Sequence, residues 1–151
     1  MKEVLVSIAD LIPIISEKIN KNEKVLLKVR GSSMEPFLHS NVTTVTLVKP
    51  EKLNRFDIIL FKDENNTYLL HRIIKIHNDI VITMGDGNTR KESLHKDQII
   101  AVVNDYQQDG MNTSMTNKKN LFKVRVWYYI RPFRKILLKL RRFLKRGNQV
   151  E

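Results

Sequence analysis

The sequence predicts a mainly β protein with an antiparallel sheet of about six strands, a short helix before the sheet and a basic amphipathic helix after it. Between residues 24 and 104, short apolar runs alternate with polar turns, and no helical period is present. Apolar residues recur at helical spacing outside this region, in residues 4–16 and 133–144. Regular short strands of this kind indicate a rolled or barrel-like sheet.

The first apolar run is amphipathic and too short to cross a membrane. Its apolar residues recur at helical spacing: Val4, Ile8, Leu11, Ile12 and Ile15. Glu3 precedes the run, Asp10 and Pro13 interrupt it, and a bilayer span needs roughly 20 apolar residues. We therefore expect a short helix over Val4–Ser16 that packs on the sheet domain, and no secretory signal.

The expected strands are short and rich in β-branched residues. They are Lys24–Arg30, Val42–Lys49, Asp57–Phe61, Tyr68–Ile76, Ile80–Met84 and Gln98–Val103. Asn104–Asn120 is polar and lacks periodicity. We therefore predict a sheet domain with the N-terminal helix over residues 1–105, a polar linker over 106–120 and a separate tail over 121–151.

Positive charge is concentrated in the tail. Residues 1–117 hold 15 Lys and Arg and 15 Asp and Glu, whereas residues 118–151 hold 12 Lys and Arg and only Glu151 as an acid. The net charge of +11 therefore belongs to the tail. The chain has no cysteine, which excludes disulfides and thiolate metal sites, and its four histidines lack the spacing of zinc ligands.

The tail has the composition of a helix that lies in a membrane interface. Trp127 and Tyr128 belong to an aromatic run before Pro132, and apolar residues after it fall on one helical face. The cations Arg134, Lys135, Lys139, Arg141 and Arg142 cover the remainder. We expect this tail to bind anionic lipid. There are two alternatives. The apolar face of the tail could dock on the sheet, or its cations could bind nucleic acid.

Serine, histidine and an acid follow one another at predicted turns and strands. Gly31–Leu38 forms a corner with two serines, His71 lies in a strand-like run, and Asp86 lies in the turn Gly85–Asn88. This order suits a nucleophile, a base and an orienting acid. The alternative is that Ser32 and Glu35 form a helix capping box, which would make the hydroxyls structural.

Four boxes in this order resemble a known family. They are Gly-Ser-Ser-Met-Glu-Pro at 31–36, Phe-Asp-Ile-Ile-Leu-Phe at 56–61, Leu-His-Arg-Ile-Ile at 70–74 and Gly-Asp-Gly-Asn at 85–88. The pattern resembles the signal peptidase I and LexA-like serine peptidases over about residues 24–103. It is most similar to the signal peptidases that have histidine in place of the usual base lysine.

The resemblance implies a coiled, mostly antiparallel β-fold, no cofactor, and roles for particular residues. Ser33 matches the nucleophile, His71 the general base, Asp86 the acid of the fourth box, and Glu92 a place where related members carry a further acid. Either acid can orient His71, with a preference for Asp86. Backbone N–H groups at Gly31, Ser32 and Ser33 are the candidate oxyanion donors. Arg72 is expected on the opposite strand face, in a structural role.

The expected function is cleavage of a leader or signal peptide from a precursor at the membrane, with the enzyme on the cytoplasmic face. Family members enter the membrane through a helix ahead of the serine, and this chain shows none. Its N-terminal residues are also too few for the DNA-binding domain of repressors of this type. One alternative is a peptide-binding adaptor of the same fold without turnover, and another is a nucleic-acid-binding protein. Nucleic acid is not an expected partner of the peptidase.

Overall fold

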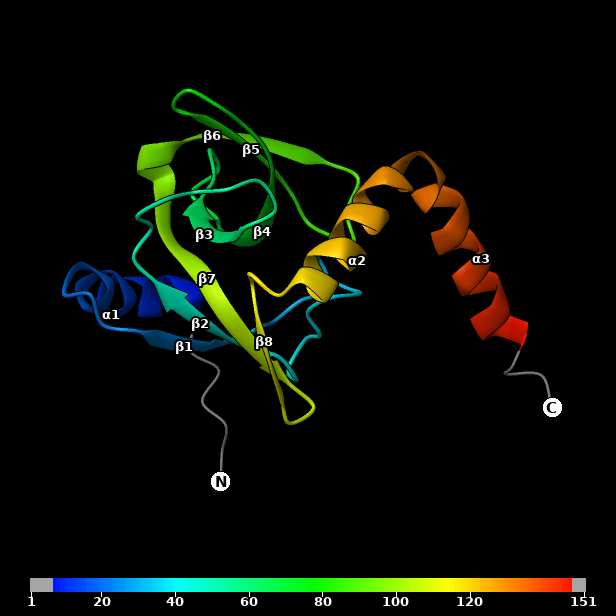
Figure 1. The fold of residues 1–151 in the computed structure, drawn as a ribbon, viewed down its shortest axis with the longest axis horizontal. Helices are drawn as coiled ribbons and strands as arrows, with labels where there is room; N and C mark the ends of the chain where they lie inside the picture. The colour runs from blue at the N-terminus through cyan, green and yellow to red at the C-terminus, as the bar shows by residue number, and fades with distance from the viewer. Residues whose placement is uncertain (1–6, 148–151) are drawn as a thin grey trace. The chain divides into compact units, whose positions relative to one another are not determined.

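The computed structural model describes residues 7–147 and divides the chain into two compact units, residues 1–115 and 116–151. We call these the sheet unit and the tail unit, and describe each by itself. The sheet unit contains the helix α1 (Ile8–Asn20) and an eight-stranded sheet (Figure 1). Its strands are β1 (Val25–Lys28), β2 (Thr44–Val48), β3 (Ile58–Lys62), β4 (Tyr68–His77), β5 (Ile80–Met84), β6 (Lys91–His95), β7 (Ile99–Gln108) and β8 (Met111–Ser114).

All strand pairs in the sheet are antiparallel. The strand order is β1-β2-β7-β3-β4-β5-β6, and β8 pairs with β7. The prediction of a mainly β, antiparallel fold is confirmed, but the expected number of strands was too low. The two missed strands, β6 and β8, have the sequences KESLH and MNTS, which contain little β-branched or aromatic character.

The predicted linker over residues 106–120 is wrong. Strand β7 continues to Gln108, and a hairpin turn with positive φ at Asp109 and Gly110 leads directly into β8. Polar residues occur here because this hairpin is exposed on much of its surface and not because the chain is irregular. The boundary between the two units falls at Met115, ten residues beyond the expected end of the sheet domain.

Strand β3 is the centre of the sheet unit because both of its faces are buried. Ile58 and Leu60 contribute to one hydrophobic core, and Ile59 and Phe61 contribute to another on the opposite face. Helix α1 covers the first core with Ile12, Ile15 and Ile19. Its N-cap is Ser7, whose hydroxyl accepts a hydrogen bond from the Ala9 N–H, 3.3 Å away.

The N-terminal helix is therefore confirmed, with different bounds. It extends four residues beyond the expected end, from Ser16 to Asn20, because Ile19 is also buried in the core. Val4, which was expected at its beginning, lies outside the described residues.

The tail unit consists of two helices joined by a short 3-10 turn. They are α2 (Lys118–Tyr129), η2 (Arg131–Phe133) and α3 (Arg134–Gly147). Pro132 lies in the turn, where its missing N–H and fixed φ are tolerated, so the break expected at this residue is confirmed. In residues 7–147, no helix is long and apolar enough to cross a membrane.

Candidate functional site

The loop that carries Ser33 is a series of turns, and a hydrogen bond and two buried side chains hold it on the core. Gly31 has φ +81°, a conformation that suits glycine, and its N–H donates to Ser40 Oγ at 3.0 Å. Met34 and Leu38 are fully buried in the core that α1 covers. The loop is not helical, so Ser32 and Glu35 do not form the helix capping box considered above. Ser33 is therefore held next to a rigid core with its side chain partly exposed.

The turn Gly85–Asn88 holds this loop from the side. The Gly87 N–H donates to the Ser33 carbonyl oxygen at 2.9 Å. A methyl group on Gly85 would lie 2.5 Å from the Ser33 carbonyl oxygen and 3.1 Å from His71 Nε2. The backbone of Ser33 and the ring of His71 therefore both contact the bare Cα side of Gly85. Only glycine allows this approach, because a Cβ atom at 2.5 Å from the Ser33 carbonyl oxygen would be closer than Cβ atoms in proteins come to other heavy atoms.

His71 lies in β4 and is 3% exposed. Its Nδ1 is 2.9 Å from Glu92 Oε2, and Thr83 Oγ1 donates to the same oxygen at 3.0 Å. The antiparallel register pairs Thr83 with Glu92 and Ile73 with Thr83, so these polar side chains share the sheet face that carries the second core. The Phe61 ring meets the imidazole edge-on, with centroids 6.1 Å apart. Burial on all sides fixes the orientation of the ring.

The Glu92 contact also determines which nitrogen of neutral His71 carries the proton. A carboxylate only accepts hydrogen bonds, so Nδ1 carries the hydrogen and Nε2 keeps its lone pair. Nε2 is the nitrogen that faces Gly85 and the Ser33 loop. The lone pair of His71 Nε2 thus points toward the side where the Ser33 loop lies.

The preference for Asp86 as the orienting acid is wrong. Asp86 is 4% exposed and forms a two-pronged ion pair with Arg72, with Nε to Oδ1 at 2.8 Å and Nη2 to Oδ2 at 2.7 Å. Glu92 holds His71 in its place. His71 and Arg72 are adjacent, so alternation sends their side chains to opposite faces, and each face has its own carboxylate. The expected structural role of Arg72 agrees with this pairing.

Arg72 also ties down the segment before β3. Its Nη1 donates to the Phe56 carbonyl oxygen at 2.9 Å, and Phe56 has φ +77°, an unusual conformation for a bulky residue. Burial raises the pKa of the neighbouring Asp57 carboxyl, while hydrogen bonds from Asn54 and the charge of Arg72 lower it. The Arg72 guanidinium further lies 5.4 Å from the centre of the Phe37 ring in the serine loop. One buried cation thus connects three segments around the site.

The Ser33 hydroxyl forms no hydrogen bond with any residue in the range 7–147, His71 included. The N–H groups of Ser32 and Ser33 have no protein acceptor within the same range. Gly31 differs, because its N–H is bound to Ser40 Oγ. The expectation that Gly31 supplies an oxyanion donor is therefore wrong, and the open donors are those of Ser32 and Ser33.

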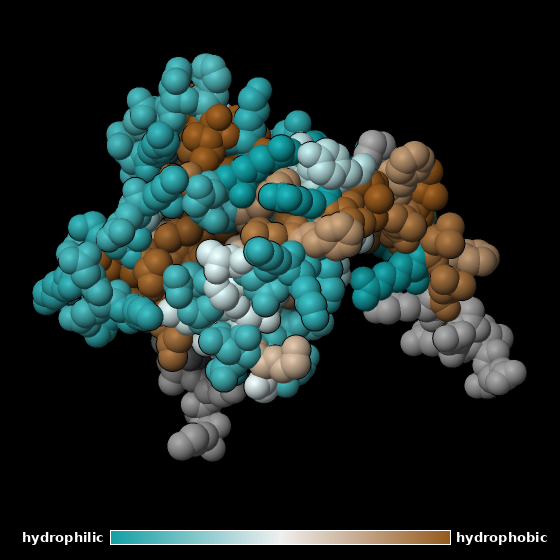
Figure 2. All heavy atoms as spheres, in the orientation of Figure 1, coloured by the Kyte–Doolittle hydropathy of each residue, from teal (hydrophilic) through white to brown (hydrophobic). Residues whose placement is uncertain are grey.

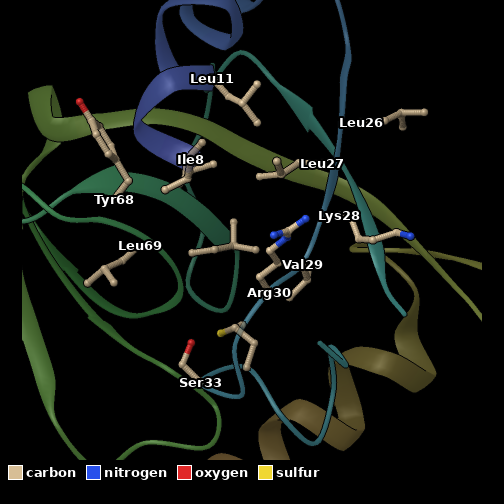
Figure 3. Close-up of a pocket in the computed structure, with 13 residues that line it drawn as sticks. Ile8, Leu11, Leu26, Leu27, Lys28, Val29, Arg30, Ser33, Tyr68 and Leu69 are labelled. Atoms are coloured by element: carbon tan, nitrogen blue, oxygen red, sulfur yellow. The ribbon is translucent and has the colours of Figure 1, made fainter. Parts of the chain in front are cut away.

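An apolar pocket of about 390 Å³ ends at Ser33 (Figure 3). Figure 3 shows the Ser33 hydroxyl pointing into the space between Leu69 and Val29. The lining comes from α1, the edge strand β1 with the residues after it, β3 and β4. It comprises Ile8, Leu11, Leu26, Leu27, Lys28, Val29, Arg30, Ser33, Met34, Leu60, Tyr68, Leu69 and Leu70. The pocket can receive apolar side chains directly beside a partly exposed hydroxyl.

Two residues of this site were missed from the sequence. Thr83 is completely buried and bonds to Glu92, and its signal is a hydroxyl at an alternate position of the valine- and isoleucine-rich strand β5. Arg30 lines the pocket, and no pattern in the sequence distinguishes it from other strand-end cations.

The predicted lipid-contacting residues of the tail fall into two groups. Lys135, Lys139, Arg141 and Arg142 are exposed on α3. Arg134 is 2% exposed, and its Nε and Nη2 donate to the Trp127 carbonyl oxygen at 3.3 and 3.2 Å. The expectation that Arg134 meets lipid headgroups is therefore wrong, because it fastens the elbow between the two helices.

The aromatic residues of the elbow are also less exposed than expected. Trp127 and Tyr128 are half-buried, and the Arg134 guanidinium lies 5.2 Å from the centre of the Trp127 ring. The exposed apolar side chains of the tail unit lie elsewhere, and many of them follow α3, where Figure 2 shows hydrophobic residues along the helix. They are Phe122, Val126, Tyr129, Phe133, Ile136, Leu137, Leu140, Phe143 and Leu144.

The sheet unit thus contains an oriented imidazole, a serine hydroxyl without a hydrogen-bond partner among the described residues, and an apolar pocket. The tail unit has an exposed apolar and cationic helix. No protein-family model matches this chain, and neither a curated protein nor a solved structure is significantly similar to it.

Proposed function

We propose that this protein is a serine endopeptidase of the signal peptidase type, with the coiled β-fold of that family, and that it removes a leader or signal peptide from a precursor. The observation that carries the proposal is the shared approach of the Ser33 carbonyl oxygen and His71 Nε2 to Gly85, beside an apolar pocket that Ser33 lines. The Glu92 contact on Nδ1 supports it, because it directs the basic nitrogen toward the serine loop. The peptide substrate lies in the pocket, and no cofactor takes part.

In this mechanism His71 Nε2 removes the proton from Ser33 Oγ, which attacks the scissile carbonyl carbon. The two side chains close up when substrate binds, as is common for catalytic hydrogen bonds that are long in resting enzymes. The N–H groups of Ser32 and Ser33 stabilise the negative charge that develops on the carbonyl oxygen. His71 then gives its proton to the leaving amine, and water hydrolyses the acyl-enzyme by the reverse exchange.

The reactivity of Ser33 can be tested before any natural substrate is known. We expect p-nitrophenyl butyrate to acylate Ser33, since its short acyl chain fits an apolar pocket, and intact-mass spectrometry with peptide mapping measures the adduct. Ser33→Ala should abolish the adduct, and Ser32→Ala is the matched control that should retain it. A folded wild-type protein that is not acylated, or is acylated elsewhere, contradicts the proposal. Peptide binding without acylation would favour the adaptor alternative.

The tail unit supports a location on a membrane surface, and the cytoplasmic side of that membrane is part of the proposal. On α3, Ile136, Leu140 and Phe143 lie on one stripe by helical spacing, and all are exposed, Phe143 by 78%. The exposed cation Lys139 borders this stripe, and Arg142 lies beyond it on the same side, whereas Arg134 projects from the opposite side. An apolar stripe with cations along its border matches an anionic lipid surface, with the stripe among the acyl chains and the cations at headgroups.

Vesicle co-sedimentation of the full chain tests this location. We expect binding to vesicles that contain phosphatidylglycerol and much weaker binding to pure phosphatidylcholine. Each cation near an anionic surface contributes about 1 kcal/mol, so Lys139→Gln should weaken binding roughly fivefold. Lys96→Gln removes the same charge from the sheet unit and should change nothing. Equal binding to both vesicle types, or salt-dependent binding to duplex DNA without vesicle binding, would contradict the membrane assignment, and the latter would favour the nucleic-acid alternative.

A further inference from the structure

The pocket beside Ser33 carries positive charge without any negative charge. Apart from Ser33 and Tyr68, its polar lining residues are Lys28 and Arg30, and none of the lining residues is acidic. The sheet unit as a whole is nearly balanced in charge, since residues 1–117 hold equal numbers of acids and bases. The unbalanced charge at the pocket is therefore local and not a consequence of overall composition.

Arg30 and Lys28 differ in where their charges lie. Figure 3 shows the Arg30 guanidinium over the pocket beside Leu27, whereas the Lys28 ammonium points away from it. Arg30 is exposed, and its guanidinium has no hydrogen-bond or ion-pair partner in the part of the chain that the structure describes. A free cation beside apolar side chains attracts a carboxylate more strongly than one in open water, because the local dielectric is lower.

We infer that Arg30 selects peptides that carry an acidic side chain close to the scissile bond, together with apolar residues that fill the pocket. This inference rests on the proposed peptidase function for its position relative to the cut, but the binding preference itself does not. The guanidinium fork suits a carboxylate, with which it can form two parallel hydrogen bonds. The apolar lining from Leu26, Leu27 and Leu69 receives the neighbouring side chains.

The position of the acidic residue follows from chain geometry. Arg30 and Ser33 are three residues apart, so their Cα atoms are separated by at most about 11 Å. An extended peptide advances about 3.3 Å per residue. The Arg30 side chain adds its own length to this separation, so the acidic side chain should lie within a few residues of the bond that Ser33 attacks.

A binding experiment tests the preference independently of turnover. The Ser33→Ala variant of the full chain is incubated with an array of random decapeptides that are acetylated and amidated, so that side chains provide all carboxylates. Peptides that bind are resynthesised with each Glu or Asp replaced by Gln or Asn. We expect one such replacement to weaken binding about tenfold, as for the loss of one charge-assisted pair, and Arg30→Gln to remove this difference.

Lys24→Gln is the matched control, because it removes the same charge from an exposed residue just before β1 that does not line the pocket. It should retain the preference, while Arg30→Glu should favour peptides with Lys or Arg. Equal binding of acidic and amide peptides to the Ser33→Ala variant, or an equal loss in Arg30→Gln and Lys24→Gln, overturns the inference. Cleavage of bound peptides by the wild-type chain is then measured separately. A preference for acidic peptides without cleavage would refute the peptidase proposal and leave the Arg30 inference standing.

Discussion

His71→Ala is expected to lower the rate of Ser33 acylation by p-nitrophenyl butyrate about 10²–10⁴-fold, which is the usual contribution of a general base. Without the imidazole, the base that we propose for removal of the Ser33 Oγ proton is gone. Glu92→Gln should also be slow although it keeps the size of the side chain. Its amide NH₂ can donate to Nδ1, which moves the ring proton to Nε2 and removes the lone pair that faces Ser33. Release of p-nitrophenol under single-turnover conditions measures both rates.

The matched control is His77→Ala, which removes an exposed histidine from the end of the same strand. Its acylation rate should equal that of the wild type. Circular dichroism and the urea midpoint establish that the His71 and Glu92 variants are folded. If folded His71→Ala is acylated at the wild-type rate, the base is not His71. If Glu92→Gln is fully active, the carboxylate holds the ring without determining its protonation.

Arg72→Leu is expected to destabilise the sheet unit by about 3–5 kcal/mol, as is typical when one partner of a buried ion pair is removed. Asp86 would remain buried with neither of the Arg72 hydrogen bonds to its carboxylate. The Phe56 carbonyl oxygen would lose its Arg72 donor in a segment that already has an unfavourable φ. The pKa of Asp57 would rise further, because Arg72 now lowers it. Urea unfolding, monitored by far-ultraviolet circular dichroism, measures the difference in the free energy of unfolding between Arg72→Leu and the wild type.

The double variant Arg72→Leu/Asp86→Leu separates the ion pair from the other contacts. Replacing both charges by apolar groups removes the uncompensated carboxylate, so the double variant should be more stable than Arg72→Leu alone. Lys75→Gln, an exposed cation on β4, should change stability by no more than about 0.5 kcal/mol. A cost below about 1 kcal/mol for Arg72→Leu would mean that the pair contributes little to the fold.

Most of the fold could be predicted because its central strands have a strong local signal. β3 is a continuous apolar run, and its burial on both faces follows directly from Ile58–Phe61. β6 and β8 could not be predicted, since their residues are polar and they exist through pairing with β5 and β7. The same cause explains the false linker. Long-range hydrogen bonding, and not local propensity, makes these segments strands.

The candidate site could be predicted as a set of residues but not as a set of contacts. Asp86 and Glu92 both follow His71 at short range, and their separation in sequence does not indicate which of them meets the ring. Which carboxylate contacts the His71 ring depends on the pairing of β4, β5 and β6. A register shift between Ile73 and Lys75 means that counting residues along the strands does not give the correct cross-strand partners. The burial of Arg134 could not be predicted from the sequence either. Its hydrogen-bond acceptor is the backbone oxygen of Trp127, and a backbone oxygen leaves no side-chain pattern in the sequence.

Gly85 limits how this site can change during evolution or engineering. A side chain at this position would meet the Ser33 carbonyl oxygen and His71 Nε2 at 2.5 and 3.1 Å, so substitution of Gly85 cannot finely adjust the spacing between the Ser33 loop and the His71 ring. Any larger residue would drive the segments apart. Adjustment has to come from changes elsewhere, such as in β5, which ends at Met84 directly before Gly85. A laboratory search for faster variants should therefore leave residue 85 fixed and diversify the strands behind it.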